Sequence, residues 1–264
     1  MITICISNSI IYTLIYIVLF FIHTPAQPKP SGFASVSGKG LETTTGGYGG
    51  ETVTVRNQSD LEKHAGSPGK KIILIDGSIT IKPFGKEINI KSNKTIRGVG
   101  TKSEIVSGGF RLINVSNVIV QNLTIRDFYL EGDWAGKKND FDGFQMDNSH
   151  HIWIDHCHLT HGGDGLIDSR KGTTFLTVSW CILSNHNKAF GIGWTDKVET
   201  QITIHHTWFK KTNQRNPSGD NILRAHLYNN LLEDIKGYGN WARGGANMII
   251  ENSVYKNVRN PHFV

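Results

Sequence analysis

Six side chains in this sequence have the types and spacing to do chemistry together. They are four aspartates, a lysine and an arginine: Asp140, Asp142, Asp164, Asp168, Lys188 and Arg215. Grouped carboxylates bind cations, while lysine and arginine bind anions or take part in proton transfer. The set therefore predicts a site that combines a cation with a carboxylated ligand.

The aspartates fall in two short clusters, DFD at 140–142 and DGLID at 164–168. Side chains alternate along an extended segment, so Asp140 and Asp142 project to the same side. Four carboxylates that lie close together repel one another unless a cation lies among them, and an all-oxygen set favours Ca²⁺ over Zn²⁺. The alternative is that they are turn residues, because Asp-Gly occurs at 142–143 and 164–165 and aspartate favours turns.

A repeat of β-rich segments would position these residues. Each segment alternates like a strand and is interrupted by one polar or aromatic residue. The interrupting residues are Asn122, His156, Trp180, His206, Asn229 and Asn252, at separations of 34, 24, 26, 23 and 23 residues. Strands at this period without amphipathic helices predict an all-β solenoid, a single-stranded parallel β-helix whose coils stack on one another. A β-sandwich is the alternative, although its strands recur about every 8–12 residues.

The charged residues keep nearly the same phase in this repeat. Asp142 and Arg215 precede the interrupting residue of their coil by 14 residues, and Asp168 precedes its own by 12. Asp164 and Lys188 precede theirs by 16 and 18. With coils about 4.8 Å apart, four coils would spread these groups over roughly 15 Å, the scale of a groove for several sugar residues.

Some polar and aromatic residues of the repeat also have expected positions. Asn229 and Asn252 predict an internal ladder of amide hydrogen bonds, and Asn122 is expected to point into the stack. Trp134 and Trp241 fall in loops and are candidates for contact with sugar rings. Sequons that would permit glycosylation in a eukaryotic host occur at Asn57, Asn93, Asn114 and Asn122.

Several ordered motifs resemble those of the pectate lyases, a large bacterial, fungal and plant polysaccharide lyase family. They are HHIWIDHCHLT, GGDGLIDSRKGTTFLTVSW, NHNKAFGIG, and QRNPS followed by AHLYNN, and the likeness runs from about Gly32 to the end of the chain. The resemblance implies a right-handed parallel β-helix. It also implies calcium-dependent β-elimination in α-1,4-linked polygalacturonate, which gives 4,5-unsaturated oligogalacturonides.

The resemblance also implies residue roles. The family's calcium-binding carboxylates match Asp140, Asp142, Asp164 and Asp168. Lys188 matches the lysine that contacts the substrate carboxylate, and Arg215 matches the catalytic arginine. The family's second arginine, five residues later, is Asp220 here, so Arg224 is the remaining candidate for that substrate contact. Asp164 stands where bacterial members often have glutamate, and this shorter side chain would reach the ion through water.

The charge balance fits an acidic polymer. The sequence has 28 Lys and Arg against 22 Asp and Glu, a formal net charge of +6, and residues 1–26 contain none of them. A basic surface attracts polyanions through its long-range field. Nucleic acid is not expected as a partner, because no nucleic-acid-binding motif is present and the acidic clusters would repel phosphate.

The first 26 residues predict a signal peptide. Residues 10–22 are an apolar run, and small residues precede a cleavage position before Gln27. The run is short for a membrane span, which needs about 20 residues, although the lack of a preceding positive charge leaves an uncleaved anchor as the alternative. We therefore expect a secreted monomer without stable membrane association. Residues 27–264 are expected to form one domain, truncated at its C-terminus or ending there without the usual cap.

Two cysteines follow the interrupting residue of adjacent coils by one position. Cys157 and Cys181 are 24 residues apart, so they are expected to stack. In an oxidising compartment the pair could form a disulfide if the side-chain vectors suit the bond. Two buried free thiols are the alternative.

The sequence thus favours a calcium-dependent pectate lyase over three alternatives. A pectin lyase acts on methyl-esterified substrate without calcium, which would leave the four aspartates unexplained. A glycoside hydrolase would need an acid and base pair about 6.5–9.5 Å apart if inverting, and would give Lys188 and Arg215 no role. The third alternative is a catalytically inactive wall-binding protein on the same fold.

Overall fold

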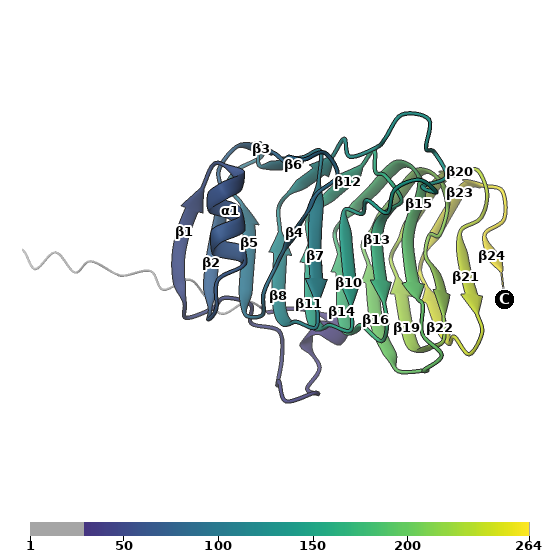
Figure 1. Cartoon of the computed structure of the whole chain (residues 1–264). Helices are drawn as coiled ribbons and strands as arrows, with labels where there is room; N and C mark the ends of the chain where they lie inside the picture. The colour runs from purple at the N-terminus through teal and green to yellow at the C-terminus, as the bar shows by residue number, and fades with distance from the viewer. Residues whose placement is uncertain (1–28, 264) are drawn as a thin grey trace, which may run out of the picture.

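Residues 29–263, which the computed structural model describes, wind into stacked coils of short parallel strands (Figure 1). One sheet of nine strands forms one side of the coil. Its strands are β1 (Glu51–Val55), β2 (Lys71–Ile75), β5 (Lys94–Gly98), β8 (Ser116–Gln121), β11 (His150–Asp155), β14 (Thr174–Ser179), β16 (Thr200–His205), β19 (Ile222–Tyr228) and β22 (Met248–Glu251). The predicted parallel β-helix is confirmed, and the β-sandwich is excluded.

A second sheet of fifteen strands forms the rest of the coil. Its first strands are β3 (Ser78–Thr80), β4 (Glu87–Asn89), β6 (Glu104–Val106), β7 (Gly109–Ile113), β9 (Thr124–Arg126), β10 (Phe144–Asp147), β12 (His158–Thr160) and β13 (Gly165–Arg170). The later ones are β15 (Ile182–Gly193), β17 (Trp208–Gln214), β18 (Ser218–Asp220), β20 (Leu231–Ile235), β21 (Asn240–Arg243), β23 (Val254–Val258) and β24 (His262–Phe263).

The long strand β15 joins the two arms of this second sheet. Its first residues pair with β12 and its last residues pair with β13, so the strand turns a corner between them. The corner lies at Asn185, whose φ is 50°. The arm that contains β10, β13 and the end of β15 carries the residues predicted to do chemistry.

The interrupting residues of the repeat are the corners of the coil. All six have φ between 47° and 55°, and asparagine is among the residues that tolerate this left-handed region best. Asn122, Asn229 and Asn252 are exposed, so the expectation that Asn122 points inward and that the others form an internal ladder is wrong. A left-handed residue bends the chain, and at these corners it turns the side chain outward.

The core consists of aliphatic side chains stacked in register inside the coil. Ile152, Leu176 and Ile202 occupy the same position on β11, β14 and β16 and are at most 1% exposed. Full burial of such a side chain stabilises the fold by about 1.5–3 kcal/mol. Helix α1 (Gln58–Ala65) adds Leu61 and Ala65 to this core near β2 and β4.

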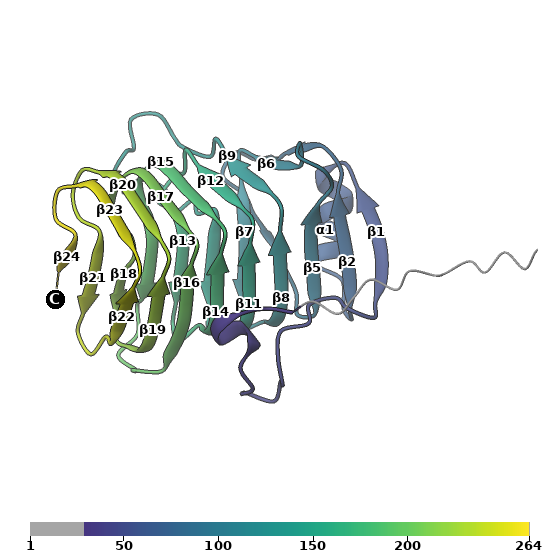
Figure 2. The same cartoon turned by 180° about the vertical axis from the view of Figure 1, so that it is seen from behind.

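The segment before β1 crosses the outer face of the nine-stranded sheet (Figure 2). Its short 3₁₀ helix η1 (Gly32–Ser35) places the Ala34 N–H 3.0 Å from the Thr177 hydroxyl, and further along Asn117 Oδ1 accepts from the Thr45 N–H at 2.6 Å. Gly32 has φ +56°, and an added Cβ would lie 2.5 Å from Thr203. No helix within residues 29–263 has the length and apolarity to cross a membrane, and the predicted signal peptide at 1–26 lies outside the described residues.

The two cysteines stack as predicted, but they are buried free thiols. The disulfide alternative is thus corrected in favour of the thiols. The Cys157 N–H donates to Cys181 Sγ at 3.5 Å, and each thiol lies near backbone carbonyls, with Cys181 Sγ 3.2 Å from the Ser179 oxygen. Burial raises the pKa of the Cys181 thiol well above its usual range, which opposes the thiolate needed for oxidation.

We expect Cys157 and Cys181 to resist alkylation in the folded protein and to be alkylated fully after unfolding without reductant. Their burial blocks the reagent until the coils open. Mass spectrometry of the peptides that contain them measures the label, and a parallel sample unfolded with reductant is the control. Label that appears at both positions only in the reduced sample would contradict the free thiols.

Candidate functional site

The structure brings the predicted residues onto one arm of the second sheet. Asp140 and Asp142 lie in the segment between β9 and β10, and Asp164 lies immediately before β13. Lys188 lies in β15, opposite Gly165 of β13 in the strand register. Arg215 follows β17 with φ 60°, a left-handed corner that ends the strand.

Three carboxylates form the centre of the site. One oxygen from each of Asp140, Asp142 and Asp164 lies within 4.8 Å of the other two. Asp140 is exposed, Asp164 is half-buried and Asp142 is fully buried. Three of the four predicted carboxylates therefore lie together, and Asp140 opens this group to solvent.

Asp168 lies deeper, beside Asp142. An added Cβ at Gly165 would lie 2.8 Å from Asp168 Oδ1 and 3.0 Å from Asp142 Oδ1, so only glycine leaves room for both carboxylates. Burial raises the pKa of Asp142 well above its usual range, with further contributions from Asp168 and Glu87. Burial likewise raises the pKa of Asp168, although Arg215 opposes the shift. Without a nearby cation, the ionised forms of Asp142 and Asp168 are therefore disfavoured.

Unpartnered buried oxygens indicate where a cation fits. Asp142 Oδ1 accepts from the Gly165 N–H at 2.8 Å, but Asp142 Oδ2 has no hydrogen-bond partner among the described residues. Asp168 Oδ1 has none either. Buried carboxylate oxygens are normally paired, and an all-oxygen set around such atoms suits a hard divalent cation such as Ca²⁺.

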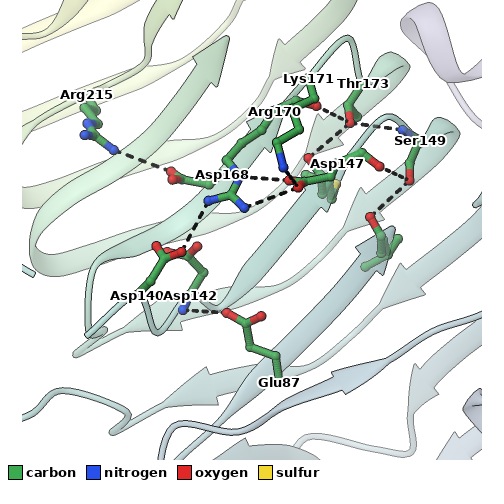
Figure 3. Close-up of polar contacts among 12 residues, drawn as sticks. Glu87, Asp140, Asp142, Asp147, Ser149, Asp168, Arg170, Lys171, Thr173 and Arg215 are labelled. Carbon is green, nitrogen blue, oxygen red and sulfur yellow. Dashed lines mark hydrogen bonds and ion pairs between the residues drawn. The ribbon is translucent and has the colours of Figure 1, made fainter. Parts of the chain in front are cut away.

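The two predicted basic residues contact two of the aspartates. The Lys188 ammonium donates to Asp164 Oδ1, and Lys188 is 6% exposed. Arg215 Nη1 lies 3.6 Å from Asp168 Oδ1, and the Arg215 guanidinium lies over the Trp194 ring at 5.3 Å from its centroid. Figure 3 shows Arg215 pointing toward Asp168 from the far side of the cluster.

Sequence reasoning missed two residues of this site. Glu87 Oε1 accepts from the Asp142 N–H at 3.0 Å, and burial raises the pKa of Glu87 to about 7 (Figure 3). Arg170 donates to Asp147 at 2.8 Å and reaches Asp140 at 3.4 Å. Arg170 follows Asp168 by two residues in β13, so strand alternation could have identified it. Glu87 lies on an earlier coil, outside the aligned segments, and gave no such signal.

Arg224 does not belong to the cluster, and its expected role as a substrate contact is corrected. It is exposed in β19 of the nine-stranded sheet, where it lines a separate hollow with Phe33 and Ile249. The chain passes a further corner between Arg215 and Arg224, because β18 belongs to one sheet and β19 to the other. Arg215 and Arg224 are therefore close in sequence but lie on different sides of the coil.

Comparisons with known proteins agree with the resemblance found in the sequence. A pectate lyase family profile matches residues 7–262. A pectate trisaccharide-lyase of Thermotoga maritima is 43% identical over 211 residues, which cover 77% of this chain and 57% of that protein. A pectate trisaccharide-lyase of Bacillus licheniformis is 34% identical over 247 residues, which cover 87% of this chain and 68% of that protein. The chain thus spans little more than half the length of the Thermotoga relative.

Solved structures share the architecture. A pectate lyase from Bacillus sp. N165 in complex with trigalacturonate has a TM-score of 0.70 to this chain at 24% identity, with 88% of this chain and 89% of that chain covered. A thermostable pectate lyase has a TM-score of 0.71 at 23% identity, with 87% and 78% covered. At these identities the likeness shows the fold alone.

We expect Asp142→Asn to raise the thermal midpoint in a buffer that contains a strong chelator. The amide oxygen keeps the acceptor for Gly165, and the amide nitrogen replaces the unpartnered, repelling oxygen. Removing this repulsion should stabilise the fold by on the order of 1 kcal/mol, or about 2–4 °C for a chain of this size. Calorimetry measures the midpoint.

Asp140→Asn is the matched control for this variant. It removes the same charge from an exposed position, so its midpoint should stay close to that of the unaltered protein. A midpoint of Asp142→Asn that falls below that of Asp140→Asn would show that the buried carboxylate stabilises the fold by itself.

Proposed function

The chain belongs to the pectate lyase family, and we propose that it is a secreted lyase that cleaves polygalacturonate by calcium-dependent β-elimination. One arrangement supports this above all. Three carboxylates, one of them with an unpartnered buried oxygen, lie next to two basic residues, Lys188 and Arg215, on the following two coils. The secretion predicted from residues 1–26 stays a prediction.

The reaction requires positive charge beside a uronate carboxylate. Elimination removes the C5 proton, the electron pair of the C5–H bond forms the C4–C5 double bond, and the C4–O bond breaks. Its electrons pass to the glycosidic oxygen, which leaves with the other part of the polymer and takes up a proton from solvent. Negative charge develops on the adjacent carboxylate as the proton leaves, so a fixed cation there lowers the barrier. The Lys188 ammonium, held at Asp164, supplies such a charge from the protein.

Asp140, Asp142 and Asp164 are the residues that would hold calcium. When bound, calcium would neutralise the uronate carboxylate and acidify the C5 proton. The assignment of Asp168 as a fourth ligand stays a prediction, because its carboxylate also contacts Arg215.

Arg215 is the candidate base. Arginine holds its proton more tightly than other side chains, so the role demands an environment that disfavours the protonated guanidinium. Calcium held by the aspartates would add positive charge on one side of Arg215, and Asp168 places a carboxylate oxygen 3.6 Å from Arg215 Nη1. Arg215 Nη1 makes no hydrogen bond among the described residues, so this donor is not committed to another group of the protein.

We expect a chelator to abolish the formation of unsaturated product from polygalacturonate, and Ca²⁺ to restore it where Zn²⁺ does not. The reason is the all-oxygen donor set, which favours the harder ion. Ultraviolet absorbance of the unsaturated uronide measures the product. Full activity in excess chelator would exclude calcium and favour a pectin lyase, which methyl-esterified substrate would then reveal.

We expect Arg215→Lys to lower turnover by about 10²–10⁴-fold while binding of polygalacturonate changes only a few-fold, because a general base acts on the rate. Lysine keeps the charge but not the guanidinium geometry. Lys188→Ala should raise KM and also lower kcat, because its charge meets the substrate carboxylate before and during proton removal.

Arg56→Lys is the control for the arginine replacement, because Arg56 is exposed and, among residues 29–263, forms an ion pair with Asp76 alone. Steady-state kinetics and equilibrium binding to the polymer separate the two effects. Unchanged turnover in Arg215→Lys would remove Arg215 from the base role. If the unaltered protein binds the polymer tightly but forms no unsaturated product, it is a catalytically inactive wall-binding protein.

A further inference from the structure

A cleft lies near the carboxylate cluster, at the corner of the coil that includes Asn185. It has a volume of about 900 Å³ and is lined by the loop between β9 and β10, by residues of β15 and β17, and by the C-terminal ends of β20 and β23 with the residue that follows each. Trp134 lines one end, and the basic residues Lys211, Lys236 and Arg259 line the rest. The cleft is separate from Asp140, Asp142 and Asp168, none of which lines it.

The basic residues of the cleft recur from coil to coil. Ile235 and Val258 are paired and are the last residues of β20 and β23. Lys236 and Arg259 follow them directly, so they hold the same position on adjacent coils. Lys211 lies one coil earlier in β17, level with Asp234, which precedes Lys236 by two residues. Adjacent coils are about 4.8 Å apart, so the three side chains place positive charge at short intervals along the coil axis.

These three cations are available to a ligand. All are exposed, and none takes part in an ion pair within residues 29–263. One acidic side chain lines the cleft, Asp234, and its Oδ1 accepts from Asn257 Nδ2 at 2.8 Å. The cleft therefore carries excess positive charge, although salt bridges elsewhere neutralise many basic residues.

Trp134 gives the cleft an aromatic surface. Trp134 is 49% exposed, and its ring makes T-shaped contacts with the rings of Tyr129 and His186. Asn187 Nδ2 donates to the Trp134 carbonyl at 2.9 Å, which fixes the loop that carries the indole. An exposed aromatic side chain that is held in place in this way can pack on the C–H groups of a sugar ring.

The cleft adjoins the carboxylate cluster through His186. His186 lines the cleft, and its Nε2 lies 2.9 Å from the Asp164 carbonyl oxygen. His186 is buried, so this contact places the cleft next to the backbone that carries Asp164.

We propose that this cleft binds further uronate residues of the polymer whose elimination occurs at the carboxylate cluster. The inference rests on the proposed function, because it takes polygalacturonate as the substrate. Lys211, Lys236 and Arg259 pair with successive carboxylates, and the Trp134 ring packs on a sugar face. The cleft thereby increases affinity for long chains and takes no part in proton removal.

The test compares a double variant, Lys236→Gln with Arg259→Gln, with a control double variant, Lys70→Gln with Lys91→Gln. Both remove two exposed positive charges, but Lys70 and Lys91 lie at the other end of the coil. Steady-state kinetics are measured with polygalacturonate and with trigalacturonate. The cleft variant should raise KM for the polymer about five- to tenfold, with unchanged kcat and unchanged kinetics on the trimer.

Trp134→Ala provides a second measurement, with Trp180→Ala as its control, because Trp180 is similarly exposed at 52% on a different corner of the coil. Only Trp134→Ala should raise KM for the polymer. Equal KM values for the cleft variants and their controls would overturn the inference while the lyase activity stands. Absence of unsaturated product from the unaltered protein would instead overturn the proposed function.

A direct binding measurement separates uronate recognition from general attraction to anions. Isothermal titration in chelator, with hexagalacturonate, trigalacturonate and sulfate as probes, should show tighter binding of the hexamer that Lys236→Gln with Arg259→Gln removes. Equal loss of sulfate and hexamer binding would reduce the cleft to a nonspecific anion site and overturn the assignment.

Discussion

The backbone pairing of each coil with the next is the interaction on which the rest of the structure depends. Every strand pairing of the two sheets is parallel, so residues one repeat apart lie directly above one another. Inside the coil this produces stacked aliphatic rows such as Ile152, Leu176 and Ile202. Outside the coil the same register aligns charged side chains that are distant in sequence, which is how Lys188 comes to lie at Asp164.

Electrostatics opposes this packing at one place. Asp142 and Asp168 are fully buried, lie side by side and have raised pKa values, so they add no stability of their own. The surrounding coils hold them there, because Gly165 leaves the space and its N–H satisfies one oxygen of Asp142. Such tension between stability and charge is common at functional sites, where the ligand supplies the missing counter-charge.

The sequence predicted the coil and most of the cluster because both follow from a single period. Asp140, Asp142 and Asp164 share a phase in the repeat, and phase becomes proximity once the strands stack. The errors occurred at corners. A left-handed residue turns its side chain outward, so Asn122 and its equivalents are exposed rather than inside.

The prediction that Arg224 contacts the substrate is wrong for a related reason, because a corner separates Arg224 from Arg215 and places it on the other sheet. Glu87 lies before Asn122, the first interrupting residue of the repeat, and its contact with Asp142 joins residues 55 positions apart. The period of the repeat therefore does not predict this contact. Period alone therefore locates a residue along the coil axis, but the side of the coil on which it lies depends on corner positions that hydrophobic alternation does not reveal.

The same geometry explains why a solenoid suits a polymeric anion. A polymer that lies along the coil axis meets a new side chain about every 4.8 Å, so affinity can grow by repetition without a deep pocket. The carboxylate cluster alone would repel a polyuronate, and the basic residues must outweigh it along the remaining length. Lys188, Arg215 and Arg170 lie at the cluster itself, while Lys211, Lys236 and Arg259 lie in the neighbouring cleft. These six basic residues therefore lie along the two surfaces that the proposed substrate would follow, and Asp140, Asp142, Asp164 and Asp168 lie where a cation would offset their charge.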